Sequence, residues 1–123
     1  MKVEIFYREK DDNFRTSYRG IKNIVEEFKK KYTFKLLEIQ LIQVEEKNVE
    51  KYKFLGHITV KINGRDIEER NDDNYTIKDR YYEENNKKVN YIPEKVFEKA
   101  VKDYIDSSII AQEMKGEEPD KIC

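Results

Sequence analysis

Residues 54–68 read Phe54-Leu55-Gly56-His57-Ile58-Thr59-Val60-Lys61-Ile62-Asn63-Gly64-Arg65-Asp66-Ile67-Glu68. Apolar and polar side chains alternate between His57 and Ile62, which is the pattern of a strand buried on one face. Asn63-Gly64 follows at once, and this dipeptide supplies the positive backbone angles of a two-residue hairpin. The charged residues 65–69 form a short return strand, of the kind that protects a sheet edge from other molecules. The segment therefore predicts a β-hairpin at one edge of a sheet.

A strand and a helix are predicted at the start of the chain. Val3, Ile5 and Tyr7 alternate with other residues as in a strand, and apolar Phe6 indicates that its second face is covered too. Apolar residues from position 18 to position 32 then recur every three or four residues, which is the period of an amphipathic helix. Thr16 or Ser17 is the expected capping residue of this helix.

Three further elements complete the pattern. Residues 34–44 predict a second strand at an edge of the sheet, and residues 46–53 predict a short helix. Pro93 favours the start of a last helix, whose apolar stripe continues through Ile105. Polar stretches predict loops at residues 70–78 and 83–88. The order is β-α-β-α-β-β-α, which predicts an α/β fold and by itself leaves open how its two layers are arranged.

Residues 54–68 resemble the third strand and hairpin of a small thioredoxin-like family of prokaryotes. The usual sequence of that family in this segment is Phe-Leu-Gly-Ser-Pro-Thr-Ile-Arg-Ile-Asn-Gly-Arg-Asp-Ile-Glu. A second match lies in the family's C-terminal pattern, which is Cys-Arg-x-Tyr, then Pro-Pro, then an apolar helix with a central alanine. The residues of this chain that match it are Arg80, Tyr82, Pro93 and Ala100. The resemblance implies a thioredoxin-like fold, a four-stranded mixed sheet flanked by helices, in one domain over residues 1–114. The polar residues 115–123, which include Gly116 and Pro119, predict a tail.

The chain departs from the family at the positions that carry redox chemistry. His57-Ile58 stand where the family has Ser-Pro, and that proline is a cis residue facing the redox site. Asp79 stands at the cysteine of the C-terminal pattern. The family's Cys-x-x-Cys pair corresponds to Lys10 and Asn13 or, one position later, to Asp11 and Phe14. Because thiol–disulfide exchange begins with attack by a thiolate, the resemblance implies a redox-inactive member.

Cysteine usage agrees with this interpretation. The single cysteine is Cys123, which excludes an internal disulfide, a Cys-x-x-Cys pair and a multi-cysteine zinc site. An oxidoreductase role would require the reactive sulfur to come from a partner or a substrate.

Composition excludes several classes of partner. The 25 basic and 26 acidic residues nearly cancel, so no broad electrostatic field attracts nucleic acid or an anionic membrane. No apolar run approaches the roughly 18 residues of a membrane span, and the N-terminus is strand-like rather than a signal peptide. We therefore expect a cytoplasmic protein that binds neither nucleic acid nor membrane and needs no cofactor.

One candidate site follows from the implied fold, which brings His57 close to Asp11, Asp12 and Asn13. An aspartate beside a histidine can orient it as a general base, or the group can hold a divalent metal ion. The alternative is structural: the carboxylates cap a helix N-terminus, and His57 is a partly exposed strand residue. We favour this alternative and assign no metal ligand.

A candidate interface lies at the end of the last helix, which continues past the length needed to cover the sheet. Its apolar residues there, Ile109, Ile110 and Met114, pack back on their own sheet or are covered by a partner or a second copy. The expected function is a protein-binding or scaffold module, with a homodimer as one form. The alternative is a small enzyme or metal-binding protein that uses His57 with Asp11 or Asp12.

Overall fold

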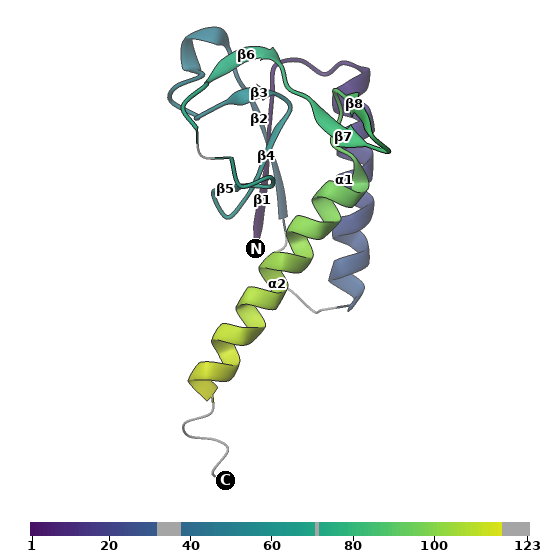
Figure 1. Ribbon diagram of the computed structural model, residues 1–123, viewed down its shortest axis with the longest axis vertical. Coiled ribbons are helices and arrows are strands. Elements are labelled where there is room, and N and C mark those ends of the chain that lie inside the picture. Colours follow the sequence, from purple (N-terminus) through teal and green to yellow (C-terminus); the bar gives the residue numbers. More distant parts are fainter. Residues whose placement is uncertain (32–37, 71, 117–123) are drawn as a thin grey trace.

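The structure is a computed structural model that describes residues 1–31, 38–70 and 72–116, with side chains described as far as Ser107. It is a mixed α/β fold with a four-stranded mixed sheet and two helices (Figure 1). The elements in chain order are β1 (Lys2–Tyr7), α1 (Asp12–Lys31), β2 (Glu38–Gln43), the 3₁₀ helix η1 (Glu46–Asn48), β3 (Leu55–His57), β4 (Thr59–Ile62), β5 (Arg65–Asp66), β6 (Thr76–Asp79), β7 (Tyr82–Glu84), β8 (Lys87–Val89) and α2 (Glu94–Gly116).

The main sheet has the strand order β2-β1-β4-β5. β1 pairs in parallel with β2 and antiparallel with β4, with Val3 opposite both Ile39 and Ile62. β4 continues into β5 through Asn63 and Gly64, whose φ angles of 50° and 85° are those that a tight hairpin requires. The predicted central strand, the hairpin and the four-stranded mixed sheet are therefore confirmed.

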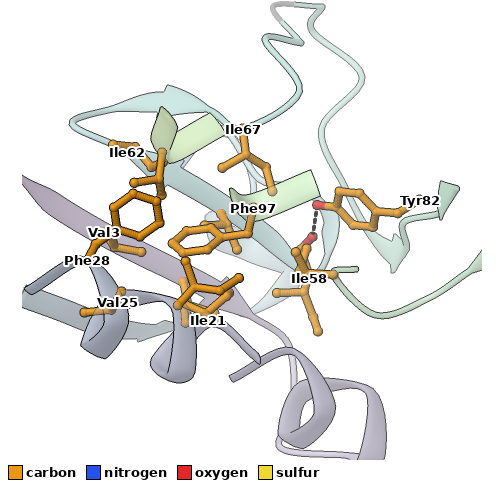
Figure 2. Packing of buried hydrophobic residues seen from close by; sticks show 14 of the residues in the cluster. Val3, Ile21, Val25, Phe28, Ile58, Ile62, Ile67, Tyr82 and Phe97 are labelled. Atoms are coloured by element: carbon orange, nitrogen blue, oxygen red, sulfur yellow. Dashed lines mark hydrogen bonds between the residues drawn. The ribbon is translucent and has the colours of Figure 1, made fainter. Parts of the chain in front are cut away.

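Both faces of the main sheet are covered. On one face, α1 and α2 bury the larger core, in which Val3, Ile21, Ile58 and Phe97 are each at most 1% exposed (Figure 2). Burial of each such side chain contributes roughly 1.5–3 kcal/mol before the cost of ordering it. On the other face, a smaller cluster of Phe6, Val44 and Phe54 is covered by Val49, Tyr52 and Ile77. The covered second face predicted from Phe6 is thus confirmed.

Helix α1 begins earlier than the sequence pattern predicts. Its capping residue is Asp11, whose Oδ1 accepts a hydrogen bond from the Phe14 N–H at 2.9 Å. The prediction of Thr16 or Ser17 as the cap is wrong, because the apolar face of the helix begins at the buried Phe14, four residues before Tyr18. The Ser17 hydroxyl instead lies buried and accepts a hydrogen bond from the Ile92 N–H.

The segments between the long elements differ most from prediction. The predicted helix at 46–53 forms only η1 followed by turns, which return Phe54 to the smaller core. The predicted loop at 70–78 contains the start of β6, which pairs in parallel with β3. The predicted loop at 83–88 is a hairpin of β7 and β8 that turns at Asn85-Asn86. These strands are only three or four residues long and rich in charged residues, so no alternation of apolar residues marks them in the sequence.

Helix α2 begins at Glu94, directly after Pro93, as predicted. Figure 1 shows its C-terminal half continuing beyond the ends of the sheet and α1. The side chains of the interface candidates Ile109, Ile110 and Met114 lie outside the described residues, as does Cys123. Neither helix, within the part of the chain that the structure describes, has a stretch apolar and long enough to cross a membrane.

Candidate functional site

His57 ends β3, and its side chain is 1% exposed. The prediction of a partly exposed histidine is therefore wrong. The peptide bond to Ile58 is cis. Ring atom Nδ1 accepts a hydrogen bond from the Arg8 backbone N–H at 2.8 Å, and Nε2 lies 3.1 Å from Asp11 Oδ1. A backbone N–H can only donate, so Nδ1 is the acceptor nitrogen, and Nε2 carries the proton that it donates to Asp11.

Asp11 connects the histidine to the start of α1. Its side chain is 30% exposed, and Oδ1 accepts hydrogen bonds from both His57 and the Phe14 N–H. Partial burial raises the pKa of Asp11, but the hydrogen bonds from His57 and Phe14 outweigh it, so the pKa is lower than that of an ordinary aspartate. The carboxylate is ionised at neutral pH and is held by two donors.

Arg8 joins the same site from the end of β1. Its guanidinium forms an ion pair with Asp79 at 2.9 Å and donates to the Ile77 carbonyl at 3.0 Å. Burial lowers the pKa of Arg8, but the neighbouring Asp79 and Glu9 raise it by more. Asp79, at the position that the resemblance assigns to a cysteine, is thus joined to the end of β1 by an ion pair. Arg8 was not predicted, because only the fold places the end of β1 beside β6.

The other positions that the resemblance assigns to redox residues are spread apart. Lys10 and Asp12 are exposed, and Asp12 forms an ion pair with Arg15 instead of contacting His57. Asn13 is half-buried. The rings of Phe14 and Tyr7 pack with their centroids 4.5 Å apart, and Ile58 is fully buried in the larger core. Of the three predicted candidates, the structure brings together His57 and Asp11 and leaves Asp12 outside.

This arrangement holds three elements together. The imidazole joins the end of β1, the start of α1 and the end of β3 through two hydrogen bonds. A general base needs a ring nitrogen that is free to take a proton from a substrate, and here both nitrogens have partners within the chain. Among the residues that the structure describes, no three His, Cys, Asp or Glu side chains are grouped in a way that could hold a metal ion.

A second buried polar network was missed by the sequence analysis. Arg80 forms two hydrogen bonds with Asp66, at 2.7 and 2.8 Å, and a third with Glu68 at 3.2 Å. The guanidinium lies over the ring of Tyr82, 4.8 Å from its centroid, and the Tyr82 hydroxyl donates to the Ile58 carbonyl at 2.6 Å (Figure 2). Burial raises the pKa of Tyr82 well above its ordinary range, so it stays a donor. The available signal in the sequence was that Arg80 and Asp66 both lie in the two segments that carry the resemblance.

A groove of about 550 Å³ lies between α2 and the β4–β5 hairpin. Its apolar lining is formed by Ile62, Ile67, Val96, Ala100 and Tyr104. Charged side chains of both signs stand around it, from Arg65, Glu68, Glu69, Lys99 and Asp103. The sequence pattern placed the apolar positions of α2 in the core but could not show that one row of them is only half-buried.

The described chain thus offers a closed polar site and an open apolar groove. In the polar site, His57 and the carboxylates of Asp11 and Asp79 bind groups of the same chain. In the groove, half-buried side chains of α2 remain accessible. Comparison of the chain with protein-family models, with curated proteins and with solved structures found no match.

Proposed function

We propose that this chain is a redox-inactive thioredoxin-like protein that binds another protein through the groove between α2 and the β4–β5 hairpin. The strand order β2-β1-β4-β5 supports the thioredoxin-like fold that the sequence motifs imply. So does the placement of both helices on one face of the sheet and of η1 with its following turns on the other.

The redox-inactive part of the proposal rests on the chemistry of the polar site. Disulfide exchange needs a thiolate that attacks a sulfur atom, and the corresponding positions hold carboxylates, an imidazole and apolar side chains. Asp11 and Asp79 are also held by His57 and Arg8, so neither is free to move toward a bound disulfide.

An insulin-reduction assay tests this part. The purified chain is added in catalytic amounts to insulin and dithiothreitol, with an authentic dithiol thioredoxin as the positive control. We expect the rate of insulin precipitation to equal that of dithiothreitol alone. A rate that rises in proportion to the amount of this chain would contradict the proposal.

The binding part rests on one observation, the apolar groove of about 550 Å³ with its charged rim. Open apolar hollows of this size on a protein surface are characteristic of binding sites. Val96, Ala100 and Tyr104 are half-buried on the groove side of α2, while Phe97 and Val101 on the neighbouring face fill the core. Such a groove fits a peptide segment with one or two apolar anchors and charges of either sign beside them.

A peptide-display selection tests the groove. Random peptides are selected on the purified chain, and their affinities are then measured for the wild type, Ala100→Arg and Lys102→Ala. Ala100→Arg fills the groove from a helical position without removing core atoms, while Lys102 lies on the exposed side of α2 and serves as the matched control. Circular dichroism checks that both variants fold.

We expect selected peptides to bind the wild type and Lys102→Ala equally and to lose at least about tenfold in affinity on Ala100→Arg, which corresponds to about 1.4 kcal/mol. Failure to select any peptide, or equal binding to Ala100→Arg, would refute the groove as the binding site. The cytoplasmic location expected from the sequence stays a prediction.

A further inference from the structure

β2 is an outer strand of the main sheet, and its free edge lacks the usual protection. Within the described residues it pairs with β1 on one side and with no strand on the other. Its sequence, EIQLIQ, has one charged residue in six, whereas 41% of the whole chain is charged. Natural edge strands are commonly short or carry lysine, proline or a bulge that prevents pairing. β5, at the opposite edge, is only Arg65–Asp66, but β2 has none of these features.

The backbone of β2 presents free hydrogen-bonding groups along this edge. The Glu38 N–H donates to the Met1 carbonyl at 3.3 Å, and the Val44 N–H donates to the Tyr7 carbonyl at 2.8 Å. Because backbone groups alternate in direction along a strand, the even-numbered residues of β2 face β1. The N–H and C=O groups of Ile39, Leu41 and Gln43 therefore point away from β1, toward the free edge.

The side chains give this edge an apolar centre. Leu41 is 39% exposed, and among the described residues it and Tyr81 are the large hydrophobic side chains that are exposed. Ile39, two residues earlier on the same face of the strand, packs against the larger core. Leu41 therefore lies at the middle of the free edge, just beyond the part of the sheet face that α1 and α2 cover.

We infer that a second copy of this chain pairs with β2, antiparallel and around a two-fold axis at Leu41. In such a pair, residues whose backbone groups point outward lie opposite one another. A two-fold axis at Leu41 lets all three outward residues of β2 form hydrogen bonds: Leu41 lies opposite Leu41 of the second copy, and Ile39 lies opposite Gln43. This register places no two Glu38 carboxylates opposite each other, and it joins the two main sheets into one of eight strands.

The chemistry of the strand favours a second copy over a different partner. The edge carries almost no charge, so it offers a charged partner nothing to recognise, whereas its three outward residues pair with themselves about the central leucine. β2 and the α2 groove lie at opposite edges of the sheet. The inference therefore goes beyond the proposed function and does not depend on it.

Sedimentation equilibrium of the full chain tests the dimer. We expect the wild type to form dimers at high micromolar concentration and Leu41→Glu to raise the dissociation constant at least about tenfold, because like charges would face each other across the axis. Tyr81→Glu is the matched control, since it places the same charge on the other exposed hydrophobic position. It should dimerise as the wild type does. A monomeric wild type, or a Leu41→Glu variant that dimerises normally, would overturn the inference.

A charge-swap mixture tests the register. Leu41→Glu and Leu41→Lys should each be monomeric alone and should associate when mixed, because opposite charges then meet at the axis. Gln43→Pro removes an outward N–H and keeps the backbone hydrogen bonds to β1, although it also removes the bond from Gln43 Nε2 to the Arg8 carbonyl. It should therefore also weaken the dimer. Circular dichroism and thermal unfolding confirm that each variant is folded. If the mixture stays monomeric while the wild type dimerises, the pairing of Leu41 with Leu41 is wrong.

The dimer at β2 and the binding groove beside α2 can be tested independently of each other. Leu41→Glu should bind the groove-selected peptides as the wild type does, and Ala100→Arg should dimerise as the wild type does. Loss of dimerisation in Ala100→Arg would place the self-association at α2 and overturn the assignment to β2.

Discussion

His57 and Asp11, which are 46 residues apart in the sequence, are joined by a hydrogen bond of 3.1 Å between Nε2 and Oδ1. The other ring nitrogen accepts the Arg8 N–H, so the imidazole lies between the end of β1 and the start of α1. Both interactions occur at a side chain that is almost fully buried. The histidine thus satisfies a backbone donor and a helix cap at the place where the resemblance locates redox chemistry.

This geometry predicts a single tautomer for His57. Long-range proton–nitrogen NMR correlations at neutral pH should show Nε2 protonated and Nδ1 unprotonated, because the Arg8 N–H needs an acceptor. A doubly protonated ring, or a proton on Nδ1, would contradict the hydrogen-bond pattern. His57 is the only histidine of the chain, so the signals need no separate assignment.

The low pKa of Asp11 predicts a pH-dependent contribution to stability. The pKa of Asp11 is lower in the folded protein than that of an ordinary aspartate. Such a carboxylate stabilises the folded state when the pH is above the pKa of the unfolded chain, and it loses this effect as the pH falls through the pKa of the folded protein. The stability advantage of the wild type over Asp11→Asn should therefore be present at neutral pH and shrink below about pH 4. Urea unfolding at several pH values measures it, and an advantage that grows on acidification would contradict the prediction.

A comparison of Asp11→Ala with Asp11→Asn separates the contribution of the helix cap to stability from that of the carboxylate charge. Asparagine caps helices as well as aspartate does and keeps an acceptor oxygen, whereas alanine can accept neither the Phe14 N–H nor the His57 Nε2–H. Asp11→Ala should therefore lower the free energy of unfolding by about 1 kcal/mol at neutral pH. Asp11→Asn should lose less than this. Equal losses in the two variants would show that the cap contributes nothing at this position.

The ion pair of Arg80 with Asp66 predicts a large effect of a small substitution. Both side chains are at most 3% exposed, so Asp66→Asn leaves the buried guanidinium with only the partly exposed Glu68 as its counter-charge. We expect a loss of about 3–5 kcal/mol in the free energy of unfolding, measured with urea. The control is Arg65→Ala, which breaks an exposed pair with Glu69 and should cost less than about 1 kcal/mol. Similar losses in both variants would contradict the prediction.

Gly56 and Gly64 both have a positive φ angle but differ in how closely other atoms surround them. Gly56 has a φ of 115°, and a Cβ there would lie 2.8 Å from Arg80 Cβ and 3.1 Å from the Lys78 carbonyl oxygen. Gly64 has a φ of 85° and would meet nothing within 4 Å. Gly56→Ala should therefore cost roughly 2–3 kcal/mol and Gly64→Ala about 1 kcal/mol in thermal or urea unfolding. The reverse order would show that the approach of β3 to β6 tolerates a side chain.

Local chemistry was enough to predict the long elements. The alternation in β1, the helical periodicity of α1, Asn63-Gly64 and Pro93 each act within a few residues, so the order of the main elements could be read from the chain. The approach of His57 to Asp11 was also expected, because the implied fold places the ends of their elements together. The family and the function stay predictions of the sequence.

Contacts between distant segments determined the rest. β6 pairs with β3 across about twenty residues, and the burial of His57 depends on β1, α1 and β3 meeting at one point, which no local pattern records. The Arg80–Asp66 pair, the groove beside α2 and the open edge of β2 likewise arise from which elements become neighbours. Short-range backbone preferences thus set the elements, whereas burial and long-range hydrogen bonding decide which side chains form the site and which surfaces stay exposed.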